Sequence, residues 1–200
     1  MKRLFKALYY WIFACFFQLK FNSIASRLQQ RVPVYLVDID NTLADTWPSL
    51  RDRVYLRDRD RYRSLSVFIG MRKLIAEQLK KAKVIFISAR SYRCYKATAE
   101  WLQSCGFEGA ELILVTKAED KMYYIKTLVL KGLELVYIDD LSYNHEHGEL
   151  KLYHELIREL KDLPLTYLGI KEIESINSNY EINHQDTQKT FQDFSNYSQY

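Results

Sequence analysis

The chain has 200 residues, of which 48% are hydrophobic and 27% are charged. A chain of this size and composition can build one domain of ordinary size around an apolar core, which excludes a wholly disordered protein. The formal net charge is only +4, so the charge balance permits a nucleic acid or a membrane surface as partner but requires neither.

The first thirty residues form a basic and apolar segment that we expect to be helical. MKRLFK is followed by the apolar run ALYYWIFACFF, which is too short to span a bilayer, since a span takes about 20 residues. Three interpretations remain open: a helix packed against the domain, an interfacial helix that touches a membrane surface through residues 1–20, and a signal or anchor. Gln18 and Lys20 interrupt the approach to Ser23-Ile24-Ala25, the small-x-small site that a signal would use, which argues against a signal. We therefore expect a cytoplasmic protein, with peripheral membrane contact as an alternative.

Residues 32–46, VPVYLVDIDNTLADT, combine an apolar run with a cluster of carboxylates and hydroxyls. The run from Val32 to Val37 is typical of a buried parallel strand. Asp38 and Asp40 follow it directly, at the end of the strand where ligands of open α/β sheets bind. Mg²⁺ binds oxygen ligands of this kind and would hold the two carboxylates together. One carboxylate could then attack phosphorus while the other transfers protons.

The segment from Arg51 to Arg63, RDRVYLRDRDRYR, alternates arginine and aspartate with a surplus of arginine. Such a run is either a solvated face or a set of guanidinium groups that lean over the strand ends and attract an anionic substrate. Residues 45–64 are too few for a folded cap domain. We therefore expect a rather open site.

Strands and helices alternate through the rest of the chain. The apolar patterns predict a helix over Ser64 to Lys83, a strand over 84–87, a helix that stops at Cys105-Gly106, a strand over 112–115, a helix from Lys121 to about Leu130, a strand over 135–138, a helix over 149–160 and a strand over 165–168. This alternation predicts an α/β fold, a three-layer sandwich with a central parallel sheet.

Each of the first four predicted strands is followed by residues that can carry chemistry. Ser88 follows the second strand, Lys117 and Lys121 follow the third, and Asp139-Asp140 follows the fourth. Taken alone, each of these residues has a structural explanation, such as a helix cap for the aspartates. Their arrival in order at successive strand ends predicts one shared site.

In this order the motifs resemble those of the haloacid-dehalogenase-like (HAD) hydrolase superfamily. DIDNT resembles the first motif, ISAR the second, Lys121 with the apolar residues after it the third, and YIDD the fourth. The resemblance covers Val32 to Leu168. It implies a HAD-like Rossmannoid fold with a minimal cap, and a Mg²⁺-dependent phosphomonoester hydrolase.

The resemblance also implies a role for each motif residue. Asp38 would form an aspartyl-phosphate, and Asp40 would protonate the leaving oxygen and then activate water. Ser88 would bond the transferring phosphoryl oxygens, and Lys121 would neutralise the phosphate and the nucleophile. Lys117 competes for the lysine role, and we prefer Lys121 because it begins a predicted helix.

The same resemblance implies a ligand set for Mg²⁺ and a set of substrate contacts. The metal would be bound by Asp38, Asp139, Asp140 and the carbonyl of Asp40. The expected substrate contacts are Thr42, Ser88, Ala89, Arg90 and Lys117.

Residues 88–117, SARSYRCYKATAEWLQSCGFEGAELILVTK, carry a closer resemblance to the branch that holds acid phosphatases and the phosphatase domains of polynucleotide kinases. Ala89 stands where that branch has glycine, and Lys117 where it has arginine. The resemblance implies a phosphorylated small molecule or a phosphate-ended nucleic acid as substrate, and no obligate protein partner. The two departures leave the catalytic residues in place and bear on the choice of substrate.

The last part of the chain carries weaker patterns. In YNHEHGE, residues 143–149, we expect His145 and Asn144 to line the pocket or the loop to cap the next helix. The segment 173–200 is rich in Asn, Gln, Ser and Tyr and predicts disorder. The expected organisation is a helix over 1–30, a phosphatase domain over 31–172 and a polar tail over 173–200.

A protein of another class remains as the alternative. It is a HAD-like binding or regulatory module with little turnover, held at a membrane through its N-terminal segment. A sugar-nucleotide transferase of the DxD type fits poorly, because its DxD needs no partners such as Ser88, Lys121 and Asp139.

Overall fold

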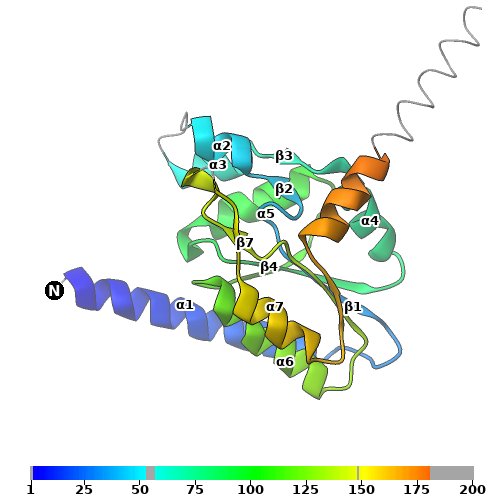
Figure 1. Ribbon diagram of the computed structural model, residues 1–200. Helices are drawn as coiled ribbons and strands as arrows, with labels where there is room; N and C mark the ends of the chain where they lie inside the picture. Colours follow the sequence, from blue (N-terminus) through cyan, green and yellow to red (C-terminus); the bar gives the residue numbers. More distant parts are fainter. Residues whose placement is uncertain (1, 53–56, 148, 181–200) are drawn as a thin grey trace, which may run out of the picture.

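The structure, a computed structural model, describes residues 2–52, 57–147 and 149–180 (Figure 1). Its central element is a parallel sheet of five strands in the order β5-β4-β1-β6-β9. The strands are β1 (Val34–Val37), β4 (Lys83–Ser88), β5 (Glu111–Leu114), β6 (Leu135–Ile138) and β9 (Thr166–Leu168). The prediction of an α/β fold with a parallel sheet is confirmed.

Strand β1 lies at the centre of the sheet and determines where the site forms. It pairs with β4 on one side and β6 on the other, and Val37 is in register with both Phe86 and Ile138. The chain winds outward from β1 through β4 to β5 and then returns to β6 on the other side. A reversal of this kind opens a crevice at the carboxyl ends of the strands, which is where ligands bind in such sheets.

Helices cover both faces of the sheet (Figure 1). On one side lie α1 (Lys2–Ala25), α6 (Lys121–Leu130) and α7 (His154–Lys161), and on the other lie α4 (Ile69–Gln78), α5 (Tyr95–Ser104) and the helical residues 170–180. Phe21 of α1 contacts Tyr124 of α6 edge-on, with ring centroids 4.8 Å apart. The strands β1, β4, β5 and β6 are therefore largely buried, which explains their near-continuous apolar sequences, whereas the edge strand β9 is exposed or half-buried.

Helix α1 packs on the domain through its second half. Phe17, Phe21 and Ile24 are buried, while the N-terminal half extends beyond the sheet (Figure 1). This agrees with the packed-helix interpretation for the second half. Within the residues that the structure describes, no helix is both long enough and apolar enough to cross a membrane.

A small insert follows β1 and covers one side of the site. It consists of β2 (Ala44–Asp45), α2 (Trp47–Asp52), α3 (Asp58–Arg63) and β3 (Ser66–Val67), and β2 and β3 pair as antiparallel strands. The helix predicted from Ser64 to Lys83 is therefore shorter and begins at Ile69. Residues 66–67 pair with β2 instead, and the Phe68 amide donates to the carbonyl of Leu43 at 2.9 Å.

The loop after β6 also differs from the prediction. β7 (Ser142–Tyr143) pairs with β8 (Lys151–Leu152), and α7 begins only at His154, not at residue 149. Residues 151–152 are held in this short ladder, and the Tyr153 amide donates to the carbonyl of Leu141 at 2.9 Å. The helix cannot begin before this pairing ends.

The predicted disorder from residue 173 is wrong for residues 173–180. Residues 170–180 are helical, and Ile173 is buried against the core. The side chain of Asn177 accepts a hydrogen bond from the Met71 amide at 3.0 Å. Gly70 lets this helix approach α4 closely, since a Cβ atom there would lie 2.7 Å from the carbonyl oxygen of Ile176. Residues 181–200 lie outside the described part of the chain.

Candidate active site

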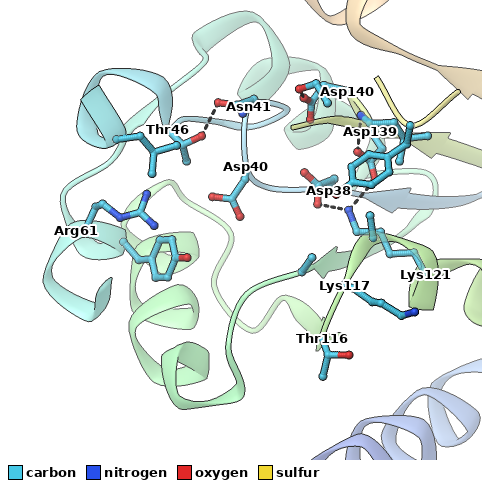
Figure 2. Close-up of a pocket in the computed structure, with 17 residues that line it drawn as sticks. Asp38, Asp40, Asn41, Thr46, Arg61, Thr116, Lys117, Lys121, Asp139 and Asp140 are labelled. Carbon is cyan, nitrogen blue, oxygen red and sulfur yellow. Dashed lines mark hydrogen bonds and ion pairs between the residues drawn. The ribbon is translucent and has the colours of Figure 1, made fainter. Parts of the chain in front are cut away.

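The carboxyl ends of β1, β5 and β6, together with the insert, surround a cavity of about 400 Å³ (Figure 2). The residues that line it come from distant parts of the sequence, and most are polar: Asp38, Asp40, Asn41, Thr46, Leu50, Arg61, Tyr62, Ala89, Thr116, Lys117, Ala118, Lys121, Asp139, Asp140, Leu141, Ser142 and Tyr153. The sequence motifs that we expected to converge do meet at one place.

Asp38 and Lys121 form the buried centre of the cavity. Asp38 follows β1, and its amide donates to the carbonyl of Ile138 at 2.8 Å, which fixes the backbone beside β6. Nζ of Lys121, the first residue of α6, lies 2.5 Å from Oδ1 of Asp38 and 2.6 Å from Oδ2 of Asp139. Burial disfavours the ammonium ion, but Asp139 and Asp38 outweigh it and raise the pKa of Lys121. The lysine is therefore held as a cation between two carboxylates.

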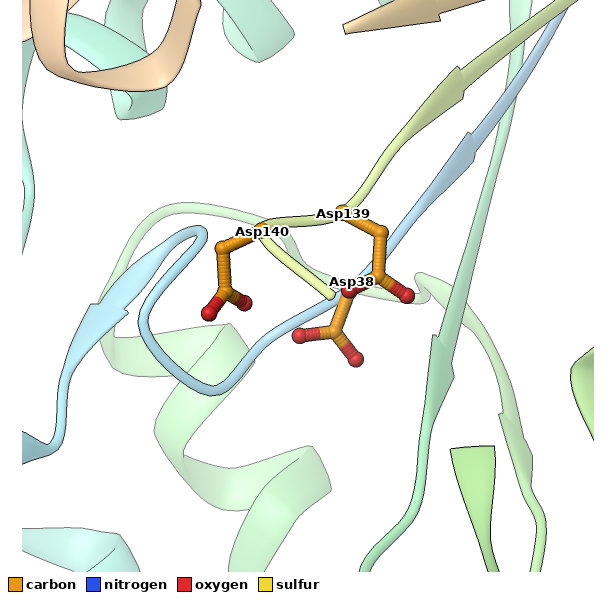
Figure 3. A group of neighbouring side chains, drawn as sticks. All are labelled: Asp38, Asp139 and Asp140. Carbon is orange, nitrogen blue, oxygen red and sulfur yellow. The ribbon is translucent and has the colours of Figure 1, made fainter. Parts of the chain in front are cut away.

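Asp38, Asp139 and Asp140 form a compact group of buried carboxylates (Figure 3). One oxygen from each lies within 4.8 Å of the others. Burial, and then the charge of Asp139, raise the pKa of Asp140 to about 7. Burial also raises the pKa of Asp38, and the lowering effect of Lys121 does not offset it.

This group has the charge and the donor atoms that a metal ion requires. One lysine cannot balance three neighbouring carboxylates, so an excess of negative charge remains at the centre of the cavity. Buried carboxylates without a counter-charge repel each other and take up protons. Hard oxygen donors in this number suit a hard divalent cation.

Asp139 and Asp140 are positioned by hydrogen bonds from both sides. The Tyr137 hydroxyl and the Leu141 amide donate to the Asp139 carboxylate, the latter at 2.9 Å. Tyr137 is missing from our sequence prediction, although it precedes Asp139 by two residues on β6 and therefore points to the same face. Its burial and this hydrogen bond make it a support for Asp139.

Thr42, which we expected to contact the substrate, is not among the residues that line the cavity. Its side chain is fully buried, and Oγ1 donates to Oδ1 of Asp140 at 3.2 Å while accepting from the Asp140 amide at 3.0 Å. Both hydrogen bonds of the hydroxyl go to one residue. Thr42 therefore positions Asp140.

Asp40 lies apart from the carboxylate group and faces Arg90. Nε of Arg90 lies 2.8 Å from Oδ2 of Asp40, and Nη2 lies 2.9 Å from Oδ1. Ser88 also donates to Oδ2, at 3.1 Å. Burial alone would raise the pKa of Asp40, but Arg90 outweighs it and holds the pKa of that carboxyl below its ordinary value.

Arg90, which we expected to contact the substrate, is not among the residues that line the cavity. Its side chain is 1% exposed and lies against the ring of Tyr62, with the guanidinium carbon 4.0 Å from the ring centroid. Nη1 donates to Thr98 at 3.2 Å. Every nitrogen of this fork is directed inward, so Arg90 acts on Asp40 and not on a ligand. Ser88, fully buried, likewise turns its hydroxyl to Asp40.

The rim of the cavity carries the remaining predicted contacts. Ala89 and Lys117 line it, and Lys117 is exposed whereas Lys121 is buried. In the arginine-rich segment, some arginines form a solvated face and one leans over the strand ends, so each of our two interpretations holds for part of it. Arg61 lines the cavity, while Arg57, Arg59 and Arg63 are exposed. Among the described residues of that run, the rim therefore gains one guanidinium group.

His145 supports the loop beside Asp140 and does not line the main cavity. Its Nε2 lies 3.0 Å from Nδ2 of Asn41 and 2.6 Å from the hydroxyl of Ser142, which in turn donates to Asp140. Asn144 donates to the carbonyl of Glu149 at 2.7 Å. Of the two alternatives for this loop, neither describes the structure: His145 and Asn144 are not among the residues that line the main cavity, and α7 begins at His154, after Tyr153.

No protein-family model and no curated protein matches the chain. The function therefore has to be inferred from the chemistry of the cavity itself. That chemistry is a carboxylate and a lysine in contact, a group of acidic ligands beside them, and a second carboxylate held by arginine.

Proposed function

We propose that the protein is a Mg²⁺-dependent phosphomonoester hydrolase of the HAD-like type, acting through an aspartyl-phosphate on Asp38. The observation that carries the proposal is the contact of Asp38 with Lys121 inside a group of buried carboxylates, at the ends of strands that are far apart in sequence. A carboxylate held beside a fixed cation is what nucleophilic attack on a phosphate dianion requires.

The residues present fit a magnesium ion. Asp38, Asp139 and Asp140, with the carbonyl of Asp40, would hold it. The excess of negative charge in the carboxylate group supports this assignment. When bound, the ion supplies positive charge that offsets the repulsion between Asp38 and the phosphate. Thr42 and Tyr137 keep Asp140 and Asp139 in position for this.

In the first step, a carboxylate oxygen of Asp38 attacks phosphorus and the ester P–O bond breaks. The leaving oxygen takes a proton from the carboxylic acid form of Asp40 and departs as an alcohol. The ammonium group of Lys121, already 2.5 Å from Asp38, stabilises the charge that is spread over the phosphoryl oxygens.

In the second step, water attacks the phosphorus of the aspartyl-phosphate. Asp40, now a carboxylate, takes the proton of this water, and inorganic phosphate leaves with Asp38 restored. The pair with Arg90 favours the carboxylate form of Asp40 and so supports this step. When Asp40 is protonated it carries no charge, so its ion pair with Arg90 is weaker. The side chain of Asp40 can then turn toward the leaving oxygen.

The rim of the cavity supports an anionic substrate. Arg61 and Lys117 add positive charge around an opening that the small insert leaves accessible. We propose a phosphorylated small molecule or a phosphate-ended nucleic acid as the substrate class, because the rim holds these cations.

A generic aryl phosphate tests the proposal. We expect the purified protein to hydrolyse it with Mg²⁺, to lose activity with EDTA and to recover when Mg²⁺ is added back. Brief incubation with substrate and acid quenching should trap an acyl phosphate that hydroxylamine cleaves. Asp38→Asn should abolish the trapped species, whereas Asp162→Asn, an exposed aspartate at the end of α7, should not.

The alternative is a HAD-like binding or regulatory module with little turnover. The engagement of both Asp40 and Ser88 in one buried network with Arg90 is the observation that favours it. A protein that binds Mg²⁺ but turns over no member of a panel of phosphorylated metabolites, nucleotides and phosphate-ended oligonucleotides would be such a module.

A further inference from the structure

One face of α1 is apolar and exposed, although the helix packs on the domain through its opposite face. The exposed residues recur every three or four positions and so lie along one side of the helix: Leu4, Phe5, Leu8, Trp11, Ile12, Phe16 and Leu19. Trp11 is 65% exposed and Leu19 is 70% exposed. Large apolar side chains gathered in this way mark an interaction surface. We call these seven residues the outer face of α1.

The other side of α1 is anchored by aromatic contacts. Phe13 and Phe17 stack on Tyr92 with centroid distances of 5.8 and 5.3 Å, and Tyr9 contacts Phe13 at 4.5 Å. Tyr92 lies shortly after β4, on the side of the carboxyl strand ends, where the candidate active site also lies. The helix is therefore fixed to the domain while its outer face points away from it.

A basic groove runs beside the outer face. It has a volume of about 940 Å³, and its charged and aromatic lining includes Lys6, Arg57, Arg59, Arg93, Tyr9 and Tyr10. Phe5 belongs to both the groove and the outer face. Asp58 also lines the groove, but it forms an ion pair with Arg61 at 3.7 Å. The groove therefore presents a surplus of positive charge next to an apolar strip.

We propose that α1 docks the protein on an anionic membrane surface, with the outer face among the acyl chains near the headgroups and the basic groove against lipid phosphates. A helix that lies in the interface buries an apolar face and places lysine and arginine at the headgroups. Trp11 sits at the middle of the outer face, and tryptophan is enriched at this depth. The segment from Leu4 to Leu19 spans roughly 22 Å, enough for an in-plane contact.

The charge pattern favours a membrane over a second copy of the chain. The sequence of α1 contains lysine and arginine but no aspartate or glutamate. Two copies that met through the outer face would bring their basic grooves near each other, and like charges at an interface oppose association. An anionic lipid surface complements the same charges.

Vesicle sedimentation tests the proposal with the full chain. The vesicles are pure phosphatidylcholine, or equal parts of phosphatidylcholine and phosphatidylglycerol. These lipids are phosphodiesters and EDTA is present throughout, so the result does not depend on hydrolase activity. We expect binding to the anionic vesicles that weakens at high salt, and much weaker binding to the neutral ones. Equal binding to both, or none, would overturn the proposal.

Matched variants locate the contact. Trp11→Glu should lower the partition coefficient at least about tenfold, because an apolar side chain leaves the interface and a negative charge enters it. Leu130→Glu, at the end of α6 and 86% exposed, should have no effect. Lys6→Gln should lower binding about fivefold, and Lys80→Gln, at an exposed position in the turn after α4, should not. An equal loss in the control variants would contradict the assignment to α1.

Two further measurements separate the competing occupants. Lipids brominated along the acyl chain should quench the emission of Trp11, and Trp11→Phe should remove the quenched fraction. Light scattering should give the same molar mass for the wild type and Trp11→Glu. A dimer that dissociates in Trp11→Glu, without vesicle binding by the wild type, would show that the outer face pairs two copies and would overturn the proposal.

Discussion

Arg90 holds the Asp40 carboxylate with a two-pronged ion pair, and the arginine itself is almost completely buried. The hydrogen bonds run from Nε to Oδ2 at 2.8 Å and from Nη2 to Oδ1 at 2.9 Å. Paired bonds of this geometry are among the strongest that side chains form. Because Arg90 lowers the pKa of Asp40, it keeps this side chain in the carboxylate form, which is the form that can take a proton from water.

Replacing Arg90 should therefore change the pH dependence of the reaction. In Arg90→Gln the pKa of Asp40 rises, so the carboxylate that activates water forms only at higher pH. The acidic limb of the kcat profile should move upward by roughly one to three pH units. Arg90→Lys keeps a positive charge and should move it less. An unmoved acidic limb in Arg90→Gln, with the fold intact by circular dichroism, would remove Arg90 from this role.

Asp38→Asn should lower kcat by at least about 10³-fold, as losses at other covalent nucleophiles do. The variant should also be no less stable than the wild type in EDTA, because it removes one of three crowded carboxylates. Aryl phosphate hydrolysis and thermal unfolding measure the two effects separately. Near wild-type turnover in this variant would mean that another group attacks the phosphate.

Magnesium should stabilise the folded protein through the carboxylate group. An ion at 100 times its Kd adds about 2.7 kcal/mol, and a protein of this size gains about 2–4 °C in Tm for each kcal/mol. Thermal unfolding with and without Mg²⁺ measures the shift. Asp139→Asn should lose most of it, and Asp162→Asn should retain it. A shift that persists in Asp139→Asn would place the ion elsewhere.

The raised pKa of Asp140 predicts how stability varies with pH in the absence of metal. The folded protein keeps this proton up to about pH 7, whereas the unfolded chain loses it near the ordinary value of 3.8. The folded state thus binds more protons between these limits, and its stability falls as the pH rises through this window, by up to about 1.4 kcal/mol per unit.

Asp140→Asn removes the part of this dependence that Asp140 contributes. In EDTA, the Tm of the variant relative to the wild type should increase as the pH is raised from about 4 to 7. Urea unfolding at the same pH values gives the free-energy difference directly. A constant difference across the window would mean that Asp140 ionises normally in the folded protein.

Gly70→Ala should destabilise the protein even though alanine is the better helix former. A Cβ atom at residue 70 would lie 2.7 Å from the carbonyl oxygen of Ile176 and 2.9 Å from Cα of Asn177. We expect a loss of about 1–3 kcal/mol from this overlap, against a propensity gain of about 1 kcal/mol. Urea unfolding measures the sum, and hydrogen exchange should show faster exchange in residues 170–180.

The matched control for this variant is Ala76→Gly, at an exposed position of the same helix. It should cost only the propensity of about 1 kcal/mol and leave exchange in residues 170–180 unchanged. A Gly70→Ala protein that is more stable than the wild type would contradict the close packing of the helix 170–180 on α4.

The sheet and the meeting of the motifs could be predicted from sequence because their signals are local. β6 occupies the expected residues 135–138, and α6 ends at the expected Leu130. Gly106 adopts a positive φ of 91° after α5, as a glycine at a helix end does. Buried parallel strands are continuous apolar runs, so the residues that follow them can be assigned to one edge of the sheet.

The direction of individual side chains could not be predicted in the same way. Thr42 and Arg90 lie in motifs that suggest ligand contact, but tertiary packing turns them to Asp140 and Asp40. The two-residue strands β2 and β8 are too short to show a period. In residues 170–180, Ile170, Ile173 and Ile176 are spaced for one helix face, but the surrounding asparagine and serine hide this pattern.

The register of β1 with β6 has a consequence for how this protein can vary. A slip of one residue between them would displace Asp139 by about 3.3 Å, farther than a metal–oxygen bond is long, and would turn it to the other face. The spacing of the acidic ligands is thus a property of the hydrogen-bond ladder, not of the loops that follow it. Insertions are tolerable in the turns at the amino ends of the strands, where they leave that ladder intact, and intolerable within the strands.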